Sequence, residues 1–225
     1  MLLIAIDTSG RHGSVALCHG GQHSFETLQL MPLEGGTYSA RLMPAIAEML
    51  DQHGISKGDL DGFVVVSGPG SFTGLRVGIA TVKGLCEVLH KPLTAITMLE
   101  AVAIARGPEA DEVTVALDAG RGEVYVGDFT VPNSHATCVR EYITKLDAFA
   151  SETAASHRRV LTPDIKVAEA LNGIGAAAEH VTPVHADDVG RIGLSKLLAG
   201  ETIDYAMLDA NYIRRSDAEI FAPKR

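Results

Sequence analysis

The sequence contains no tryptophan, only three cysteines, and aromatic residues make up just 5% of its 225 positions. Cys18, Cys86 and Cys138 are odd in number and form no Cys-x-x-Cys pair, which argues against a disulfide framework and against a thiolate zinc site. Acidic residues outnumber basic ones by 28 to 19, so neither nucleic acid nor an anionic membrane would find a broad positive surface. This composition predicts a protein of a reducing compartment.

Long apolar runs are also absent. The opening stretch "MLLIAIDTSG" has no basic segment before it, and its apolar part is far shorter than the roughly 20 residues that a membrane span needs. We therefore interpret it as the first strand of a cytoplasmic protein without membrane attachment. With 46% hydrophobic residues, the chain can bury a substantial core in one two-lobed domain or two small ones.

Short apolar runs broken by glycine and serine predict three antiparallel strands over residues 2–28, with Gly20–Gly21 as a hairpin turn. Apolar positions at helical spacing predict helices over residues 38–53 and 75–89, separated by the strand "FVVVS". A further strand and helix follow. This order is typical of a mixed sheet with helices packed on it.

The chain contains an internal repeat. "LIAIDTSGRHGSVAL" from Leu3 and "TVALDAGRGEVYVGDF" from Thr114 share an apolar strand, an aspartate, a small-residue turn with glycine and arginine, and a second strand. Asp7 and Asp118 are the matched carboxylates. Two lobes of related topology follow from this repeat.

We accordingly predict a first lobe over residues 1–107, which a C-terminal helix at about 190–200 rejoins, and a smaller second lobe over 108–189. Residues 190–225 would supply that returning helix, a strand and a tail.

The glycine-rich stretch "SGPGSFTGLRVG", residues 67–78, stands between a predicted strand and a predicted helix, where phosphate-binding loops occur. It is not a Walker A motif, because Gly68 and Gly74 are one residue too far apart and no lysine follows them. Two interpretations remain. The stretch is either a helix start capped by Ser71 or Thr73, or an anion site.

The helix after this stretch carries apolar residues at intervals of four, three, four and three, which form a heptad-like seam. The helix over residues 38–53 carries two neighbouring apolar stripes. Periodicity alone leaves two possibilities open: both helices are buried in the core, or one face packs inward while the other meets a partner protein.

The segments Asp7–Thr8–Ser9 and Asp118–Ala119–Gly120 both follow a predicted strand. Carboxylates and backbone N–H groups at such turns can hold a metal-bound phosphate, although an aspartate in a turn is more often a structural Asx-turn residue. The histidine and cysteine spacings predict no metal site.

Four segments, "AIDTS", "SGPGSFTGLRVG", "ALDAGRGEVY" and "NYIRR", in this order and at these separations, closely resemble the TsaB (YeaZ-like) family over nearly the whole chain. The resemblance implies an α/β, two-lobed actin/sugar-kinase-like fold of the duplicated ribonuclease-H-like type. It also implies a non-catalytic scaffold or activating subunit for making threonylcarbamoyladenosine beside the anticodon of tRNA.

The resemblance further implies partners. They are a TsaD-like transferase, a TsaE-like ATPase in the same complex, and a second copy of the chain when it is alone. ATP or ADP and a divalent metal would belong to the partner subunits, with no cofactor in this one, and tRNA would be met only through the complex.

Carried over to this sequence, the resemblance implies a helical-bundle interface at Tyr38, Leu42, Met49, Leu75, Ile79, Val82 and Cys86. It implies vestigial phosphate loops at Asp7, Thr8, Ser9, Asp118 and Gly120. Three positions depart from the family pattern: Tyr38, where members often have histidine, Pro163 in place of a glycine-bearing turn, and Ala210 in place of proline. The alternative function is a nucleotide-dependent enzyme of the actin/sugar-kinase-like class, or a glycopeptidase-like hydrolase, that uses Asp7 and Asp118.

Overall fold

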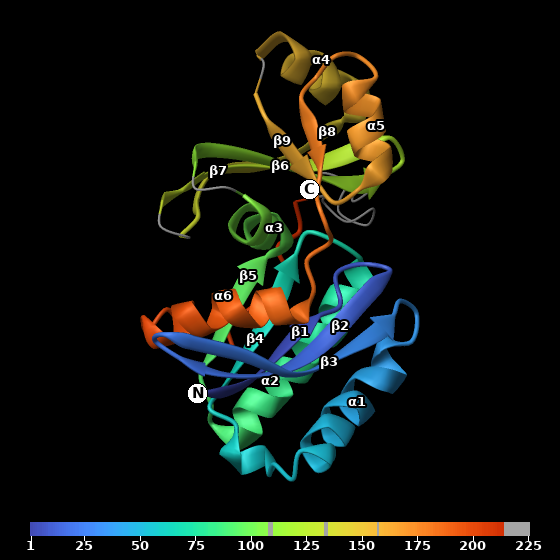
Figure 1. Ribbon diagram of the computed structural model, residues 1–225. Helices are drawn as coiled ribbons and strands as arrows, with labels where there is room; N and C mark the ends of the chain where they lie inside the picture. Colours follow the sequence, from blue (N-terminus) through green and yellow to red (C-terminus); the bar gives the residue numbers. More distant parts are fainter. Residues whose placement is uncertain (108–109, 133–134, 157, 214–225) are drawn as a thin grey trace, which may run out of the picture. The chain divides into compact units, whose positions relative to one another are not determined.

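A computed structural model describes residues 1–107, 110–132, 135–156 and 158–213 (Figure 1). The chain forms two compact units. Unit 1 comprises Met1–Ala101 and Val184–Ala210, and unit 2 comprises Val102–Pro183 and, within the described part, residues 211–213. The boundary after the first segment thus falls six residues before the predicted one at 107.

Unit 1 is built on a five-stranded mixed sheet in the order β3-β2-β1-β4-β5. The first three strands are antiparallel, and the last two run parallel to the central strand. All seven residues of the strand "GFVVVSG" are buried, as expected for a central strand covered on both faces. The strands are β1 (Leu2–Asp7), β2 (His12–Gly21), β3 (Ser24–Glu34), β4 (Gly62–Gly68) and β5 (Leu93–Thr97).

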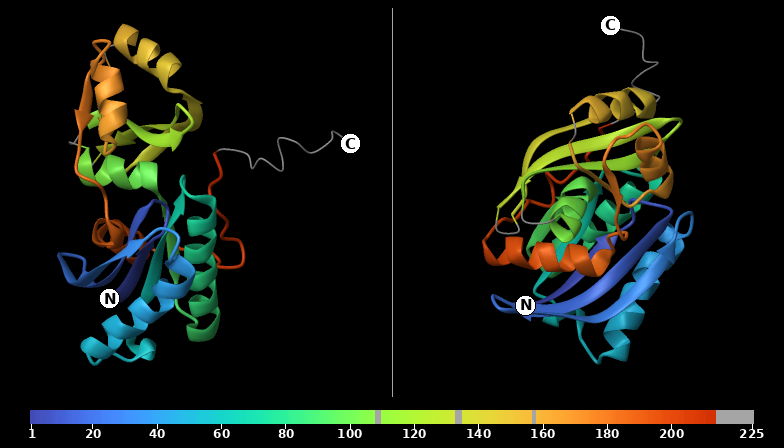
Figure 2. Two further views of the ribbon diagram at one scale, coloured as in Figure 1. Left: turned by 90° about the vertical axis from the view of Figure 1, so that its right-hand side faces the viewer. Right: turned by 45° about the horizontal axis from the view of Figure 1, so that its top comes forward.

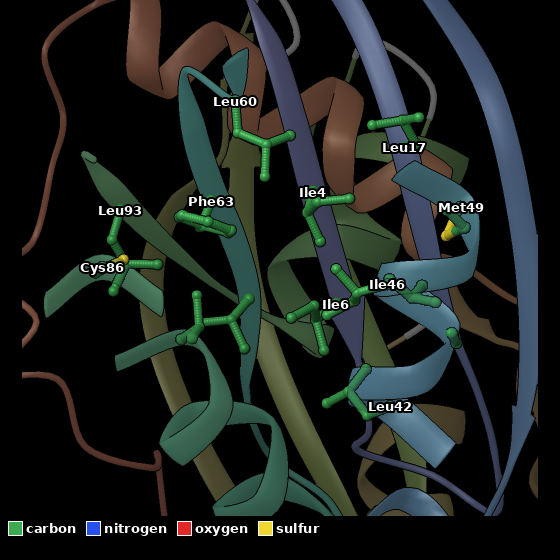
Figure 3. Packing of buried hydrophobic residues seen from close by; sticks show 14 of the residues in the cluster. Ile4, Ile6, Leu17, Leu42, Ile46, Met49, Leu60, Phe63, Cys86 and Leu93 are labelled. Carbon is green, nitrogen blue, oxygen red and sulfur yellow. The ribbon is translucent and has the colours of Figure 1, made fainter. Parts of the chain in front are cut away.

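Helices cover both faces of this sheet, α1 and α2 on one face and α6 on the other (Figures 1 and 2). Alternate strand residues such as Ile4, Ile6 and Phe63 point into the core beneath α1 and α2 (Figure 3). The helices of unit 1 are α1 (Tyr38–Gln52), the short 3-10 helix η1 (Lys57–Asp59), α2 (Phe72–Leu89) and α6 (Ala186–Leu198), while α3 (Met98–Arg106) crosses the boundary between the units.

Unit 2 repeats this topology in its own five-stranded sheet, in the order β10-β9-β6-β7-β8. Strand by strand, β6 to β10 correspond to β1 to β5, with the same parallel and antiparallel pairings. The repeat seen in the sequence is therefore a repeat of fold. The elements are β6 (Ala110–Gly120), β7 (Glu123–Val131), β8 (Thr137–Lys145), α4 (Leu146–Ser156), β9 (Val160–Thr162), α5 (Ile165–Asn172) and β10 (Ala178–His180).

One local prediction was wrong. The hairpin between β2 and β3 turns at residues 22–23 and not at Gly20–Gly21, because Gly20 pairs with Phe25 and Gly21 with Ser24 inside the ladder. A Cβ at Gly20 would lie 2.5 Å from the Ser24 carbonyl oxygen and 2.6 Å from Leu194 Cδ2, so close packing explains this glycine. The strand predicted within residues 190–225 does not form in residues 199–213, which contain a hydrogen-bonded turn, and residues 214–225 lie outside the described residues.

Candidate functional site

The glycine-rich stretch forms the end of β4 and the start of α2. Ser71 is the N-cap of the helix, and its Oγ accepts a hydrogen bond from the Gly74 N–H at 3.3 Å. The Ser71 N–H in turn donates to the Ser9 carbonyl oxygen at 2.6 Å. The helix start is therefore capped by Ser71, as one interpretation of the sequence predicted, and it packs on the turn that follows β1.

Two glycines of α2 allow this close packing. A Cβ at Gly74 would lie 2.1 Å from the Thr8 carbonyl oxygen, and a Cβ at Gly78 would lie 2.4 Å from Thr8 Oγ1. Both distances are too short for any side chain. Within the described residues, the buried Thr8 hydroxyl has no hydrogen-bond partner, which shows how tightly the helix covers it.

Asp7 organises the turn at the end of β1. Its side chain is 3% exposed, and Oδ1 accepts hydrogen bonds from the Ser9 N–H at 2.8 Å and from Ser9 Oγ at 2.6 Å. Desolvation by burial raises the pKa of Asp7, and the Ser9 hydrogen bonds and the nearby His185 oppose this rise. The arrangement is that of an Asx-turn.

Tyr38 closes the same turn from the start of α1. Its hydroxyl donates to the Gly10 carbonyl oxygen at 2.7 Å. Burial, aided by the negative charge of Asp7, raises the pKa of Tyr38 to about 12, so the hydroxyl stays protonated and remains a donor. Tyr38 thus puts an aromatic ring and one hydroxyl over the turn.

The corresponding turn in unit 2 has the same internal bond. Asp118 Oδ1 accepts from the Gly120 N–H at 2.7 Å, and the Asp118 N–H donates to Asp164 Oδ2 at 2.8 Å. Burial raises the pKa of Asp164, and the charge of Asp118 adds to this rise. Asp164 follows Pro163, so the "TPD" loop supplies the carboxylate that accepts the hydrogen bond from the Asp118 amide.

Unit 2 also contains a cavity of about 520 Å³ that is lined by three arginines. Each guanidinium already has a carboxylate partner. Arg140 pairs with Asp128 at 2.6 Å, Arg158 with Glu152 at 2.7 Å, and Arg159 with Glu179. Among the described residues, no three His, Cys, Asp or Glu side chains lie together in a way that could hold a metal ion.

The seven side chains predicted to form a partner interface lie instead in the core of unit 1. Their exposed fractions are between 0% and 7%, and all but Leu75 belong to the hydrophobic cluster that packs with the sheet. Figure 3 shows three of them, Leu42, Met49 and Cys86. The reason is that the sheet face needs a cover, and the strongest apolar seams supply it. The seven residues are Tyr38, Leu42, Met49, Leu75, Ile79, Val82 and Cys86.

The opposite, outward side of these two helices, which we call the outer face, is partly apolar. Met43 on α1 is 47% exposed and Val88 on α2 is 71% exposed. One and two helical turns before Val88 lie the small exposed residues Gly84 and Ala80, and a Cβ at Gly84 would meet no atom within 4 Å. We call this row of small residues the ridge. The spacing of large apolar residues did not predict it, because alanine and glycine add little to the hydrophobic pattern.

None of the helices in the described part of the chain combines the length and the apolar character that crossing a bilayer requires. The duplicated mixed sheets with flanking helices form a two-lobed actin-like, ribonuclease-H-like fold. A solved structure described as an uncharacterized protein with similarity to peptidase YEAZ, from Pseudomonas aeruginosa, has a TM-score of 0.76 at 26% identity. It covers 95% of this chain and 99% of that one.

The family model "TsaD: tRNA N6-adenosine threonylcarbamoyltransferase" matches residues 35–187, and the chain belongs to this family. Its curated relatives include proteins named "tRNA threonylcarbamoyladenosine biosynthesis protein TsaB". The one from Bacillus subtilis is 34% identical over 59% of this chain and 57% of its own length. The one from Haemophilus influenzae is 36% identical over 56% and 52%. The chain thus spans about half the length of these relatives, and the resemblance to the TsaB (YeaZ-like) family is confirmed.

The tight contact beneath α2 predicts opposite effects for two alanine substitutions in one helix. Gly78→Ala should destabilise the chain by about 1–3 kcal/mol, because the new methyl group meets the Thr8 hydroxyl. Gly84→Ala should stabilise it by about 0.5–1 kcal/mol, because the methyl group enters open space. Urea unfolding of both variants measures the difference, and equal effects would contradict this packing.

The buried carboxylate predicts a pH dependence. Because the pKa of Asp7 is raised in the folded chain, its contribution to stability is fully present below the unfolded value, about 3.9, and is lost as pH rises through the folded value. Asp7→Asn keeps the acceptor oxygen without the charge. The free energy of unfolding of the wild type, relative to Asp7→Asn, should therefore fall as the pH rises above about 4. Parallel pH curves for the two proteins would show that Asp7 is not perturbed.

Proposed function

We propose that this chain acts in tRNA threonylcarbamoyladenosine biosynthesis as a non-catalytic scaffold or activating subunit, and that it binds a TsaD-type transferase through the outer face. The observation that carries the proposal is the ridge of small residues on α2, Ala80 and Gly84, beside the exposed Val88. The names of the TsaB relatives support the biosynthetic role.

The chemistry of the outer face suits a helical partner. Helices approach one another to 8–10 Å, and small residues at the contact permit the shorter distances. Gly84 leaves space for such a contact, and Val88 one turn later on α2 and Met43 on α1 are exposed apolar side chains. A few well-packed residues near the centre of an interface contribute most of its affinity, so a change at the centre has the largest effect.

The two aspartate turns support the non-catalytic part of the proposal. Asp7 and Asp118 each accept a hydrogen bond from the backbone of their own turn, and the Asp118 amide is bonded to Asp164. A phosphate group at the unit 2 turn would meet two carboxylates. We therefore propose that ATP or ADP and the divalent metal are bound by partner subunits, the transferase and a TsaE-like ATPase.

The acidic composition supports indirect contact with the RNA. With a formal net charge of -9, the chain is expected to meet tRNA only through the complex. We further propose that the chain works in the cytoplasm, and that it forms a homodimer through the outer face when the transferase is absent, since one apolar surface can serve either partner.

An arginine at the centre of the outer face should block the interface. We expect Gly84→Arg to weaken binding to the purified transferase by at least tenfold in calorimetry, because the side chain occupies the space that the partner helix needs. The fold should tolerate the change, since the position is open.

The matched control is Ala155→Arg, at a small exposed residue in a helix of unit 2. It should bind as the wild type does. Equal affinities for Gly84→Arg and the control would refute the proposed surface. Val82→Asp is unsuitable for this test, because Val82 is 0% exposed and a carboxylate there would disrupt the core.

Calorimetry with ATP and Mg²⁺ tests the absence of a nucleotide site in this subunit. The isolated chain should release no binding heat at micromolar protein concentrations. Micromolar binding that disappears in Asp7→Ala would instead favour the nucleotide-dependent enzyme.

A further inference from the structure

The segment after α6, residues 203–210, has no helix or strand and yet is firmly attached to unit 1. The Ile203 N–H donates to the Leu93 carbonyl oxygen of β5 at 2.8 Å. Leu208 is 5% exposed and belongs to the hydrophobic core beneath α1 and α2. The segment therefore has one backbone anchor and one apolar anchor, and Figure 2 (left) shows it running beside α2.

A lysine of α2 adds a third anchor. Lys83 Nζ donates to the carbonyl oxygen of Ala206 at 3.3 Å and to that of Leu208 at 2.9 Å. Lys83 immediately precedes Gly84, the open position on the outer face. The segment is thus fixed to the same turn of α2 that we propose as the centre of the partner-binding surface.

Between these anchors the backbone forms a turn with its own hydrogen bonds. The Asp204 carbonyl oxygen accepts from the N–H groups of Met207 at 2.9 Å and Leu208 at 3.1 Å, and Asp204 Oδ1 accepts from the Ala206 N–H at 2.9 Å. This turn presents Met207 to solvent. At 78%, it is the most exposed of the large apolar side chains in the described residues.

We infer that the turn over residues 204–208 is part of the partner-binding surface, with Met207 as a contact residue and Lys83 as the positioning residue. The occupant is an apolar patch of the same TsaD-type transferase chain, next to the patch that covers Gly84. This inference rests on the proposed function. It extends that surface from α2 to a segment far away in the sequence.

Three physical arguments support the assignment. Methionine is enriched at interfaces, and its flexible thioether adapts to irregular apolar surfaces. The turn is already ordered, so binding loses little conformational entropy when Met207 is buried. The turn is also continuous with the outer face, because Lys83 joins it to α2.

Calorimetric titration of the full-length chain with the purified transferase tests this inference. Met207→Asp should weaken binding by about tenfold or more, since burying a large apolar side chain contributes roughly 1.5–3 kcal/mol. Met207→Leu should stay within about threefold of the wild type, because it keeps an apolar side chain of similar volume. The control Val139→Asp, at a 66% exposed position of unit 2, should have no effect.

Gly84→Arg, measured in the same experiment, separates the two proposals. If Gly84→Arg weakens binding and Met207→Asp does not, residues 204–208 lie outside the interface and the inference is wrong. If only Met207→Asp weakens binding, Met207 is a contact residue but the ridge on α2 is not, and the proposed continuity between the two surfaces is wrong. If neither variant weakens binding, or the wild type does not bind, both proposals are refuted.

Lys83 is tested by two variants with an exchange readout. Lys83→Met should speed amide hydrogen exchange of residues 203–210 and weaken transferase binding by about threefold. The exchange of the buried strand β4 should stay unchanged. Lys83→Arg can still donate to both carbonyl oxygens and should restore both properties. Faster exchange without any loss of affinity would show that Lys83 only stabilises the fold.

Discussion

The close approach of α2 to the turn after β1 is the contact on which the rest of unit 1 depends. Gly74 and Gly78 let the helix lie against the backbone and hydroxyl of Thr8, and Ser71 joins the two segments through Ser9. This contact fixes the direction of α2 and, with it, the positions of the outer ridge and of Lys83. A sequence motif that resembles a phosphate loop thus acts here as a packing motif, since its glycines serve the approach of the helix.

The sequence predicted the main elements well where large apolar residues recur with a clear period. The helices at Tyr38–Gln52 and Phe72–Leu89, the central strand and the duplication around Asp7 and Asp118 were all predicted. Periodicity reports which side of a helix is apolar, but it does not report what covers that side. The seam through Val82 was therefore assigned to a partner, whereas the sheet of the same chain covers it.

Two other features depend on contacts between residues that are distant in the sequence, and no local pattern predicts them. Gly20 was predicted to be a turn residue, but glycine is required there because Leu194 of α6 packs too closely for any side chain. The attachment of residues 203–210 depends on Lys83, more than a hundred positions away. Small residues and polar anchors of this kind become visible only when the fold brings their partners together.

The duplication gives each unit two helices at corresponding places in the chain order, after its third and fourth strands. They are α1 and α2 in unit 1 and α4 and α5 in unit 2, and the two pairs differ in length. At 1.5 Å per residue, the 18 residues of α2 span about 27 Å, whereas the 8 residues of its counterpart α5 span about 12 Å. A helix of barely two turns offers a partner little more than a point of contact. The symmetry of the strands is therefore broken by the helices, and under the proposed function this difference leaves unit 1 with the helix pair that is long enough to form a partner surface.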